Sequence, residues 1–324
     1  MNNTNEIKQK YLYNYSCQED EVELCALEMR SFFGQDSDDY IIESNIKIDP
    51  SRSPFIRDRI DIIFEGSELE EIITKVKSLT PLTETYRVIF LKTFSLGKVG
   101  FEERRRVERE VALHVPGEPD LKHPDILFGI VHVIGKWIFG YYQKGEAVWL
   151  QHQTKPHGYS TALSTRVARA VANIAVPHPA GKKAIDPCCG IGTVLVEALS
   201  MGIDIVGSDV NPLILPGTRE NIAHFGYHCE VVFRDIRKVT GTYDVAIIDM
   251  PYNLCSVISP QEQLELLQSA YSFAERIVIV TIEPIDSIIE NAGFRIVDRC
   301  IVRKGTFTRQ VIVGKNKRGK RLSL

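Results

Sequence analysis

The chain has 324 residues, 44% of them hydrophobic and 25% charged, with a formal net charge of −3. This length and composition are typical of a globular protein with two or three domains and sizeable cores. No apolar run approaches the roughly 20 residues that span a bilayer, and the polar, acidic first 30 residues do not resemble a signal peptide.

The cysteines indicate the compartment. There are seven, an odd number without metal-ligand spacing. This usage favours a reducing environment and argues against both disulfides and zinc. We therefore expect a cytoplasmic protein with no metal and no membrane association. The sequence carries no signal for an oligomeric state.

Charge is unevenly distributed along the chain. Residues 1–80 hold 9 Lys+Arg against 17 Asp+Glu, residues 81–150 hold 10 against 9, and residues 151–324 hold 20 against 16. The last 30 residues contain ten basic side chains and one acid, Asp298. A basic C-terminus suits a polyanionic substrate, although residues 315–321 equally fit a solvated tail. The acidic N-terminus argues against a protein that coats nucleic acid uniformly.

The first 80 residues alternate between strand and helix patterns. Strands are expected at 11–17, 40–48 and 59–64, and helices at 21–33 and 68–78. The second helix has one apolar stripe and Ser67 as its expected N-cap.

A second unit of strands and helices follows Pro81. We expect a strand at 86–94, a helix at 101–114 and a hairpin of 126–134 with 136–142 around Gly135. The helix contains the triplet Arg104-Arg105-Arg106, which could contact phosphate. Nearby glutamates at i,i+4 spacing favour a self-neutralised surface helix instead.

Residues 150–160 look like a linker, and after them strands and helices alternate. The expected order is helix 161–175, strand 183–186, helix 192–201, strand 204–208, helix 212–225, strands 229–233 and 243–249, helix 261–274, strand 276–281 and a hairpin of 294–302 with 308–313. This pattern predicts an α/β fold with a doubly wound parallel sheet. Its ligand should lie at the carboxyl ends of the strands.

Two motifs point to the chemistry. Ile185-Asp-Pro-Cys-Cys-Gly-Ile-Gly-Thr-Val-Leu-Val-Glu197 combines a strand end, a glycine-rich turn and a helix start, and Asp249-Met-Pro-Tyr252 follows 52 residues later. Glycines in such a turn let the backbone approach a nucleotide-like ligand closely. The second motif is close to the Asp/Asn-Pro-Pro-Tyr signature that presents an amine to a methyl donor. Together the motifs resemble the S-adenosylmethionine (SAM)-dependent amino-methyltransferases.

This resemblance implies a set of cofactor-binding residues: Asp186, Cys188, Gly190, Gly192, Thr193, Asp209 and Asp235. Asp186 would reach the cationic tail of SAM through water. Asp209, an acid about 20 residues beyond the glycine turn, is placed to accept both ribose hydroxyls. Asp235 would accept from the adenine amine. The alternative for each aspartate is an ordinary helix N-cap.

Two other interpretations of the glycine turn were weighed. A dinucleotide-binding fingerprint would need glycine at position 195, where this chain has Leu195, so NAD binding is disfavoured. Cys188 and Cys189 could be a redox pair or a nucleophile. Neighbouring cysteines on a tight turn rarely form a disulfide, and no basic residue lies nearby in sequence to lower a thiol pKa. We expect them to be small residues that line the turn.

The expected catalytic residues are Asp249, Met250, Pro251 and Tyr252. An exocyclic base amine is a poor nucleophile because its lone pair is delocalised into the ring. The Asp249 carboxylate and the carbonyl of residue 250 would accept its two protons and direct the lone pair toward the methyl group. Tyr252 offers a face for stacking a flipped base. Met250 replaces the usual first proline, while Pro251 still favours an extended backbone before it.

A longer resemblance follows from three further segments. Residues 157–175 are similar to the helix that precedes the cofactor turn in the THUMP-containing tRNA guanosine-N2 methyltransferases, and Gly207-Ser-Asp-Val-Asn211 also matches. Asp120-Leu-Lys-His-Pro-Asp-Ile-Leu127 resembles a segment of THUMP domains, which bind RNA. The resemblance spans roughly residues 85–315 and implies a ferredoxin-like domain at 1–80, a THUMP-like domain at 81–150 and a Rossmann-like methyltransferase domain at 151–324.

The function implied is SAM-dependent methylation of N2 of a guanosine in RNA, most simply tRNA. Two alternatives stay open. One is a non-catalytic RNA-binding protein on a degenerate methyltransferase scaffold. The other is an amino-methyltransferase that acts on DNA adenine or cytosine, or on a protein glutamine.

Overall fold

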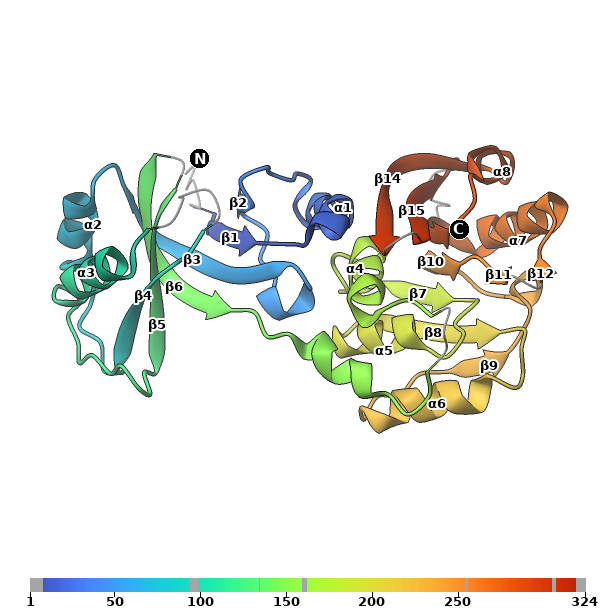
Figure 1. Cartoon of the computed structure of the whole chain (residues 1–324), viewed down its shortest axis with the longest axis horizontal. Helices are drawn as coiled ribbons and strands as arrows, with labels where there is room; N and C mark the ends of the chain where they lie inside the picture. The colour runs from blue at the N-terminus through green and yellow to red at the C-terminus, as the bar shows by residue number, and fades with distance from the viewer. Residues whose placement is uncertain are drawn as a thin grey trace, which may run out of the picture. The chain divides into compact units, whose positions relative to one another are not determined.

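The computed structural model describes residues 8–93, 99–133, 135–158, 162–253, 256–304 and 307–318, with only the backbone at 252, 253, 256, 257, 304 and 307. Its contacts divide the chain into two compact units (Figure 1). The N-terminal unit comprises Met1–Ser16 and Gln35–Glu146, and the C-terminal unit comprises Cys17–Gly34 and Ala147–Leu324. No helix in the described ranges has the length and apolar character needed to cross a membrane.

The N-terminal unit is built on one mixed sheet. Within the described residues its strand order is β2-β1-β3-β6-β5-β4. The strands are β1 (Tyr11–Tyr15), β2 (Ile41–Ser44), β3 (Ile56–Gly66), β4 (Tyr86–Phe90), β5 (Ile126–Val133) and β6 (Lys136–Lys144). Among the described strands of this sheet, only β4 and β5 pair in parallel; the β5–β6 hairpin turns at Gly135, as expected. Strands from before and after residue 80 belong to this one sheet, so the structure does not separate a domain at 1–80 from a domain at 81–150.

Two helices pack on this sheet, α2 (Leu69–Val76) and α3 (Phe101–Ala112). Their apolar stripes, including Ile72 and Val111, form a core with Phe128 and Phe139 of the sheet. Two arginines of the expected self-neutralised triplet, Arg105 and Arg106, pair with glutamates of the same helix.

The expected N-cap of α2 is wrong. Glu68 occupies the N-cap position and makes no side-chain capping bond. Ser67 instead donates its backbone N–H to the Glu71 carboxylate at 2.9 Å. The Glu71 carboxylate, one turn into the helix, thus satisfies the backbone N–H of the residue before the N-cap.

The segment before β5 owes its shape to two aspartates. The Asp120 carboxylate accepts from the backbone N–H groups of Lys122 and His123, which forms a local turn. The Asp125 carboxylate accepts from Thr85 N–H and its hydroxyl, just before β4. The two acids of this motif thus set the turn and the start of the parallel β4–β5 pair.

The C-terminal unit contains a second sheet, with order β14-β15-β13-β10-β7-β8-β9 among the described strands. The strands are β7 (Lys183–Asp186), β8 (Asp204–Asp209), β9 (Val231–Phe233), β10 (Tyr243–Asp249), β13 (Ala274–Thr281), β14 (Phe294–Lys304) and β15 (Phe307–Asn316). Five neighbouring strands of this sheet are parallel: β9, β8, β7, β10 and β13. Next to β13, β15 pairs antiparallel, and β14 pairs antiparallel with β15. This confirms the Rossmann-like α/β fold and the terminal hairpin.

Helices cover both faces of this sheet (Figure 1). They are α4 (Thr165–Ala175), α5 (Thr193–Ser200), α6 (Leu215–His224), α7 (Pro260–Phe273) and α8 (Asp286–Asn291). On one face, Leu267 of α7 and Ile289 of α8 form a core with Ile248 and Ile279 of the sheet. Alternate residues of the same strands point to the other face, on which α4 packs.

The helix α1 (Val22–Phe33) belongs to the C-terminal unit, although the sequence favours it as part of the N-terminal domain. It packs on α4 and β14 (Figure 1). The fully buried Glu28 accepts from the Asn173 amide at 2.8 Å, and Arg30 makes a bidentate pair with Asp298. These contacts join residues far apart in sequence, which explains why local patterning placed the helix with its sequence neighbours.

The expected linker is also partly structured. Val148–Thr154 forms a 3-10 helix, η3, whose His152 is buried. The His152 Nδ1 atom lies 2.8 Å from the carboxylate of Glu197, a fully buried residue of α5. Arg169 of α4 pairs with the other oxygen of that carboxylate at 2.7 Å. This buried network holds the segment before α4 against the helix that follows the glycine turn.

Candidate functional site

The glycine turn joins β7 to α5. Gly190 and Gly192 have φ angles of +51° and +80°, the left-handed region that favours glycine. A Cβ at Gly192 would lie 2.9 Å from the Thr218 methyl, whereas one at Gly190 would meet nothing within 4 Å. The turn is held by Asp209, whose carboxylate accepts from Gly190 N–H at 2.9 Å, and by the Thr218 hydroxyl, which donates to the Gly190 carbonyl. Gly190 is therefore the position where a ligand can approach the backbone.

The structure explains why Leu195 can replace the third glycine of a dinucleotide fingerprint. That glycine allows close packing of helix on strand. Here the small residue is on the strand: a Cβ at Gly207 of β8 would lie 2.5 Å from the Leu195 side chain. Helix α5 therefore packs through a leucine into a gap that Gly207 leaves open.

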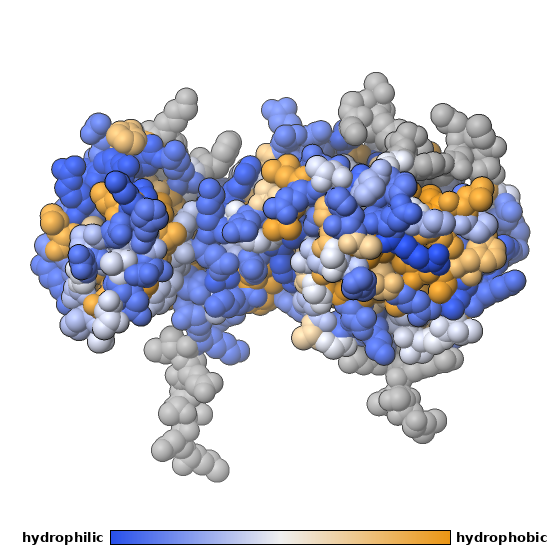
Figure 2. Space-filling view, turned by 90° about the horizontal axis from the view of Figure 1, so that it is seen from below, coloured by the Kyte–Doolittle hydropathy of each residue, from blue (hydrophilic) through white to orange (hydrophobic). Residues whose placement is uncertain are grey.

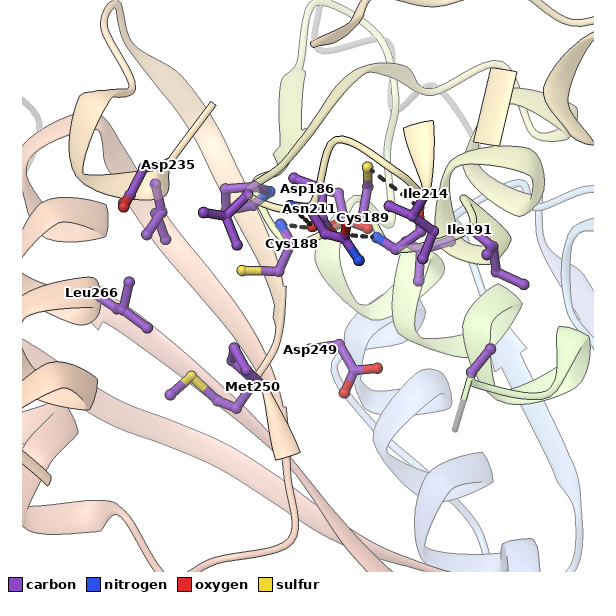
Figure 3. A pocket seen from close by; sticks show the side chains of 18 of the residues that line it. Asp186, Cys188, Cys189, Ile191, Asn211, Ile214, Asp235, Asp249, Met250 and Leu266 are labelled. Carbon is purple, nitrogen blue, oxygen red and sulfur yellow. Dashed lines mark hydrogen bonds between the residues drawn. The ribbon is translucent and has the colours of Figure 1, made fainter. Parts of the chain in front are cut away.

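A pocket of about 440 Å³ opens at the carboxyl ends of the parallel strands (Figure 3). It is lined by the glycine turn, the loops that follow β8 and β9, and the end of β10. Every predicted cofactor residue except Gly192 lines it, as do Asp249, Met250 and Pro251. The fold thus brings together residues that the sequence separates by up to 65 positions.

Three acidic side chains converge on the pocket. Asp186, Asp209 and Asp249 end β7, β8 and β10. Burial raises the pKa of Asp186 well above its usual range, and the charges of Asp249 and Asp209 raise it further, against a hydrogen bond from Cys188 N–H. Such a site favours a cation and opposes a phosphate.

Asp209 and Asp235 already have partners. The two Asp209 oxygens accept from the backbone N–H groups of Gly190 and Asn211. Asp235 caps the short helix η4 (Ile236–Lys238) and pairs with Arg237, a hydrogen bond that lowers the pKa of Asp235. Asp235 therefore has the N-cap geometry that the sequence left open, and it also lines the pocket. Its role toward a cofactor stays a prediction.

The two cysteines of the turn are free thiols. Cys188 lines the pocket half-buried, and Cys189 is buried with its Sγ 3.3 Å from where a Gly207 Cβ would lie. Burial raises the pKa of both thiols, and the carboxylates of Asp186 and Asp209 add to that effect. Thiols held protonated in this way are poor nucleophiles, which agrees with a lining role.

Asp249 differs from the other acids of the pocket. Its Oδ1 atom is buried and has no hydrogen-bond partner among the described residues. Burial raises the pKa of Asp249 to about 7, and the guanidinium of Arg309 opposes this rise. A buried acceptor without a partner is rare in folded proteins and is a common mark of a functional position.

The rest of the second motif follows the strand end. Met250 continues the ladder by donating its N–H to the Val280 carbonyl at 2.9 Å. Its side chain is buried with Leu267 in the α7 core, which explains how a residue other than proline is accommodated. Pro251 is exposed and lines the pocket. The backbone of Tyr252 forms the short strand β11 (Tyr252–Asn253), while its side chain lies outside the described residues.

Sequence reasoning missed most of the apolar lining. Leu163, Ile214, Ile258 and Leu266 line the pocket, and no motif distinguishes them from core residues. The exposed hydrophobic residues of this unit include Val210, Leu213 and Phe233, which follow or end β8 and β9. Figure 2 shows hydrophobic residues among hydrophilic ones on the surface of this unit.

The basic C-terminal segment is partly engaged in folding contacts. Arg299 pairs with Asp286 at 2.6 Å, and Arg303 pairs with Glu23 of α1 at 3.3 Å. The Arg318 guanidinium stacks over the Tyr271 ring at 4.5 Å. Residues 319–321 of the expected tail lie outside the described residues. The segment is thus less available to a polyanion than its composition indicates.

Part of the C-terminal unit is similar to known proteins. Residues 152–279 match a family described as RMKL-like, methyltransferase domain. Over 132 residues the chain is 34% identical to a tRNA (guanine(10)-N2)-dimethyltransferase of Methanothermobacter thermautotrophicus, covering 37% of this chain and 39% of that protein. It is 29% identical over 158 residues to the Pyrococcus abyssi protein of the same name, covering 45% and 47%.

Among solved structures, TrmN from Thermus thermophilus aligns over 95% of this chain and 99% of its own, with 17% identity and a TM-score of 0.47. The chain spans about half or less of the length of the curated relatives it matches. The resemblance to methyltransferases drawn from the two motifs is confirmed for residues 152–279.

Proposed function

We propose that this chain is a SAM-dependent methyltransferase acting on the exocyclic N2 amine of a guanosine in tRNA. The observation that carries the proposal is the buried Asp249 Oδ1, which has no hydrogen-bond partner among the described residues and lies in a pocket shared with the glycine turn. The matching family supports methyl transfer, and the printed names of the curated relatives support a guanine N2 amine of tRNA.

The pocket suits SAM better than a dinucleotide. SAM carries two positive groups, a sulfonium and an α-ammonium, which the carboxylates of Asp186, Asp209 and Asp249 would attract. A pyrophosphate would bring negative charge beside the same acids. Gly190 leaves space for the amino-acid tail, and Asp209 retains free lone pairs for ribose hydroxyls besides its two backbone bonds.

Asp249 would orient the amine for reaction. When bound, SAM supplies an electrophilic methyl group on sulfur. The Asp249 carboxylate and the Met250 carbonyl would accept the two amine protons, which directs the nitrogen lone pair toward the methyl carbon. Methylation of the amine would leave the electron pair of the former C–S bond on sulfur. The methylated nitrogen then sheds one proton, for which the Asp249 carboxylate is a ready acceptor.

The N-terminal unit is proposed to bind the RNA. The motif 120–127, which sets the turn before β5, is the part of this unit that resembles THUMP domains. The self-neutralised α3 is a poor candidate for phosphate contacts, so the binding surface is expected elsewhere on the unit. The six cysteines among the described residues are not in disulfides, which fits a protein of the cytoplasm.

The test is methyl transfer from isotopically labelled SAM to unmodified tRNA transcripts, with the products digested to nucleosides and identified by mass. We expect N2-methylated guanosine. Methylated adenosine, cytosine or glutamine in matched RNA, DNA and protein assays would move the substrate to one of the other amines. No SAM binding by calorimetry would support the non-catalytic RNA-binding alternative.

A further inference from the structure

The register of the sheet places Arg309 and Asp249 on one face. Asp249 of β10 lies opposite Val280 of β13, and Val280 lies opposite Val311 of β15. Opposed residues share a face of the sheet, and so do residues two apart on one strand. Arg309, two residues before Val311, therefore shares the face of Asp249. Because β15 is antiparallel to β13, Arg309 also lies toward the carboxyl end of β13, where the pocket opens.

The surroundings of Asp249 are otherwise negative on the side of the pocket. Asp186 and Asp209 end the strands β7 and β8 beside the same pocket, and the Cys188 thiol is held protonated by burial and by these acids. On α7, the Glu262 carboxylate is engaged with Ser259 at the start of the helix. None of these groups can neutralise Asp249.

The arginines of α4 and of the loop after β9 are paired with other acids. In α4, Arg166 pairs with Glu21 at 2.6 Å, and Arg169 pairs with Glu197. In the loop after β9, Arg237 pairs with Asp235.

Arg309 is the cation that acts on Asp249. Burial raises the pKa of Asp249 to about 7, and the Arg309 guanidinium, whose Nε atom is buried, opposes that rise. A carboxylate is an acceptor only, whereas a protonated carboxyl group would turn a donor toward the amine. The ionisation of Asp249 thus decides whether the amine can be oriented at neutral pH.

We propose that Arg309 favours the carboxylate form of Asp249, and so acts as a positioning residue for methyl transfer. The proposal rests on the function proposed above. No motif marks Arg309, which lies 60 residues beyond Asp249 on the terminal hairpin.

The experiment measures single-turnover methylation of a tRNA transcript, at saturating SAM and RNA, between pH 5.5 and 8.5. Three variants are compared with the wild type: Arg309→Gln removes the charge, Arg309→Lys keeps it, and Arg303→Gln removes a cation of the same hairpin that pairs with Glu23. We expect the acid limb of the Arg309→Gln profile to move up by about one pH unit, with a rate about 10-fold lower at pH 6 and close to wild type at pH 8.5. Arg309→Lys and Arg303→Gln should keep the wild-type profile.

Other outcomes overturn the proposal. An equal rate loss at every pH would mean a structural role, and a raised KM for tRNA with an unchanged kcat profile would mean a phosphate contact. If the pH–rate profile of Arg309→Lys shifts as much as that of Arg309→Gln, the positive charge of Arg309 is not the cause of the shift. Arg309→Met tests the same point if the glutamine variant does not fold.

A binding assay separates this proposal from the proposed function. SAM carries a sulfonium charge that its demethylated product lacks, so the ratio of their affinities should rise with pH as Asp249 ionises. Calorimetry should show this rise displaced to higher pH in Arg309→Gln, even on a chain that transfers no methyl group. If the pH dependence of the affinity ratio is displaced in Arg309→Gln but tRNA is not methylated, the role of Arg309 is supported and the proposed tRNA substrate is refuted. If the pH dependence of the affinity ratio is the same in Arg309→Gln and the wild type, the role proposed for Arg309 is refuted.

Discussion

The two ends of strand β10 carry the same residue type in opposite states. At the amino end, Asp244 accepts from the Lys182 ammonium at 2.7 Å and from Lys183 N–H at 2.9 Å. Burial acts to raise the pKa of Asp244, but these hydrogen bonds outweigh it and lower the pKa. At the carboxyl end, burial raises the pKa of Asp249 to about 7, and its Oδ1 has no partner among the described residues.

This difference shows at which end of the sheet the acidic side chains have hydrogen-bond partners and at which end one of them lacks a partner. The amino ends of β7 and β10 are joined to each other by the Lys182–Asp244 pair. The carboxyl ends surround a pocket whose acids exceed the cations available to them. Parallel α/β sheets bind ligands at their carboxyl ends, and here the unmet hydrogen-bonding capacity lies at that end.

The largest expected effect distinguishes the two aspartates by activity. Asp249→Ala should lower turnover on tRNA by about 10²- to 10³-fold, the scale for removing one oriented group that stabilises charge, with a smaller loss of SAM affinity because the attraction to the sulfonium is lost. Asp244→Ala, the matched control on the same strand, should keep turnover within about 2-fold. Steady-state kinetics and calorimetry measure both. Full activity in Asp249→Ala would refute the catalytic assignment.

The second prediction concerns stability against pH. The folded-state pKa of Asp249, about 7, lies above its unfolded value, so the wild type should lose stability as pH rises between these two values. From pH 5 to pH 8 this loss should be about 2–3 kcal/mol at most. Asp249→Asn should remove this loss and become the more stable protein at pH 8.

Asp244→Asn provides the control for that experiment. The folded pKa of Asp244 lies below its unfolded value, so its stabilising effect is fully present above the unfolded pKa and is lost only as pH falls through the folded one. Its contribution should therefore be flat between pH 5 and pH 8. Denaturant unfolding at several pH values measures both variants. A wild-type and an Asp249→Asn curve that run parallel would contradict the pKa argument.

The smallest expected effect compares two left-handed glycines. Gly181 lies before β7 with φ +68° and space for a Cβ, while Gly192 lies after it with φ +80° and the Thr218 methyl 2.9 Å from a Cβ. Gly181→Ala should cost only backbone strain, about 1–2 kcal/mol. Gly192→Ala should cost more, since Thr218 must move, and should also weaken SAM binding. Equal melting temperatures and equal SAM affinities would show that the turn tolerates the shift.

The sequence by itself determined much of the C-terminal unit. Local spacing and residue type were enough to predict three features of this unit. These are the order of strands and helices, the glycine turn and the acids at successive strand ends. Leu195 excluded a dinucleotide fingerprint at the level of sequence, but Gly207, which makes room for Leu195, lies on strand β8. The large residue on the helix and the small residue on the strand can be recognised as a matching pair only when the two elements are in contact.

Tertiary structure alone decided three features. The helix α1 joins the C-terminal unit because Glu28 and Arg30 find partners about 145 and 268 residues away, a choice that local periodicity does not encode. The half of the expected linker around His152 is ordered by the buried Glu197. The ionisation of Asp249 depends on its burial and on Arg309, which reaches the same face through two steps of strand register. Burial and long-range charge depend on the assembled fold, so no motif could report them.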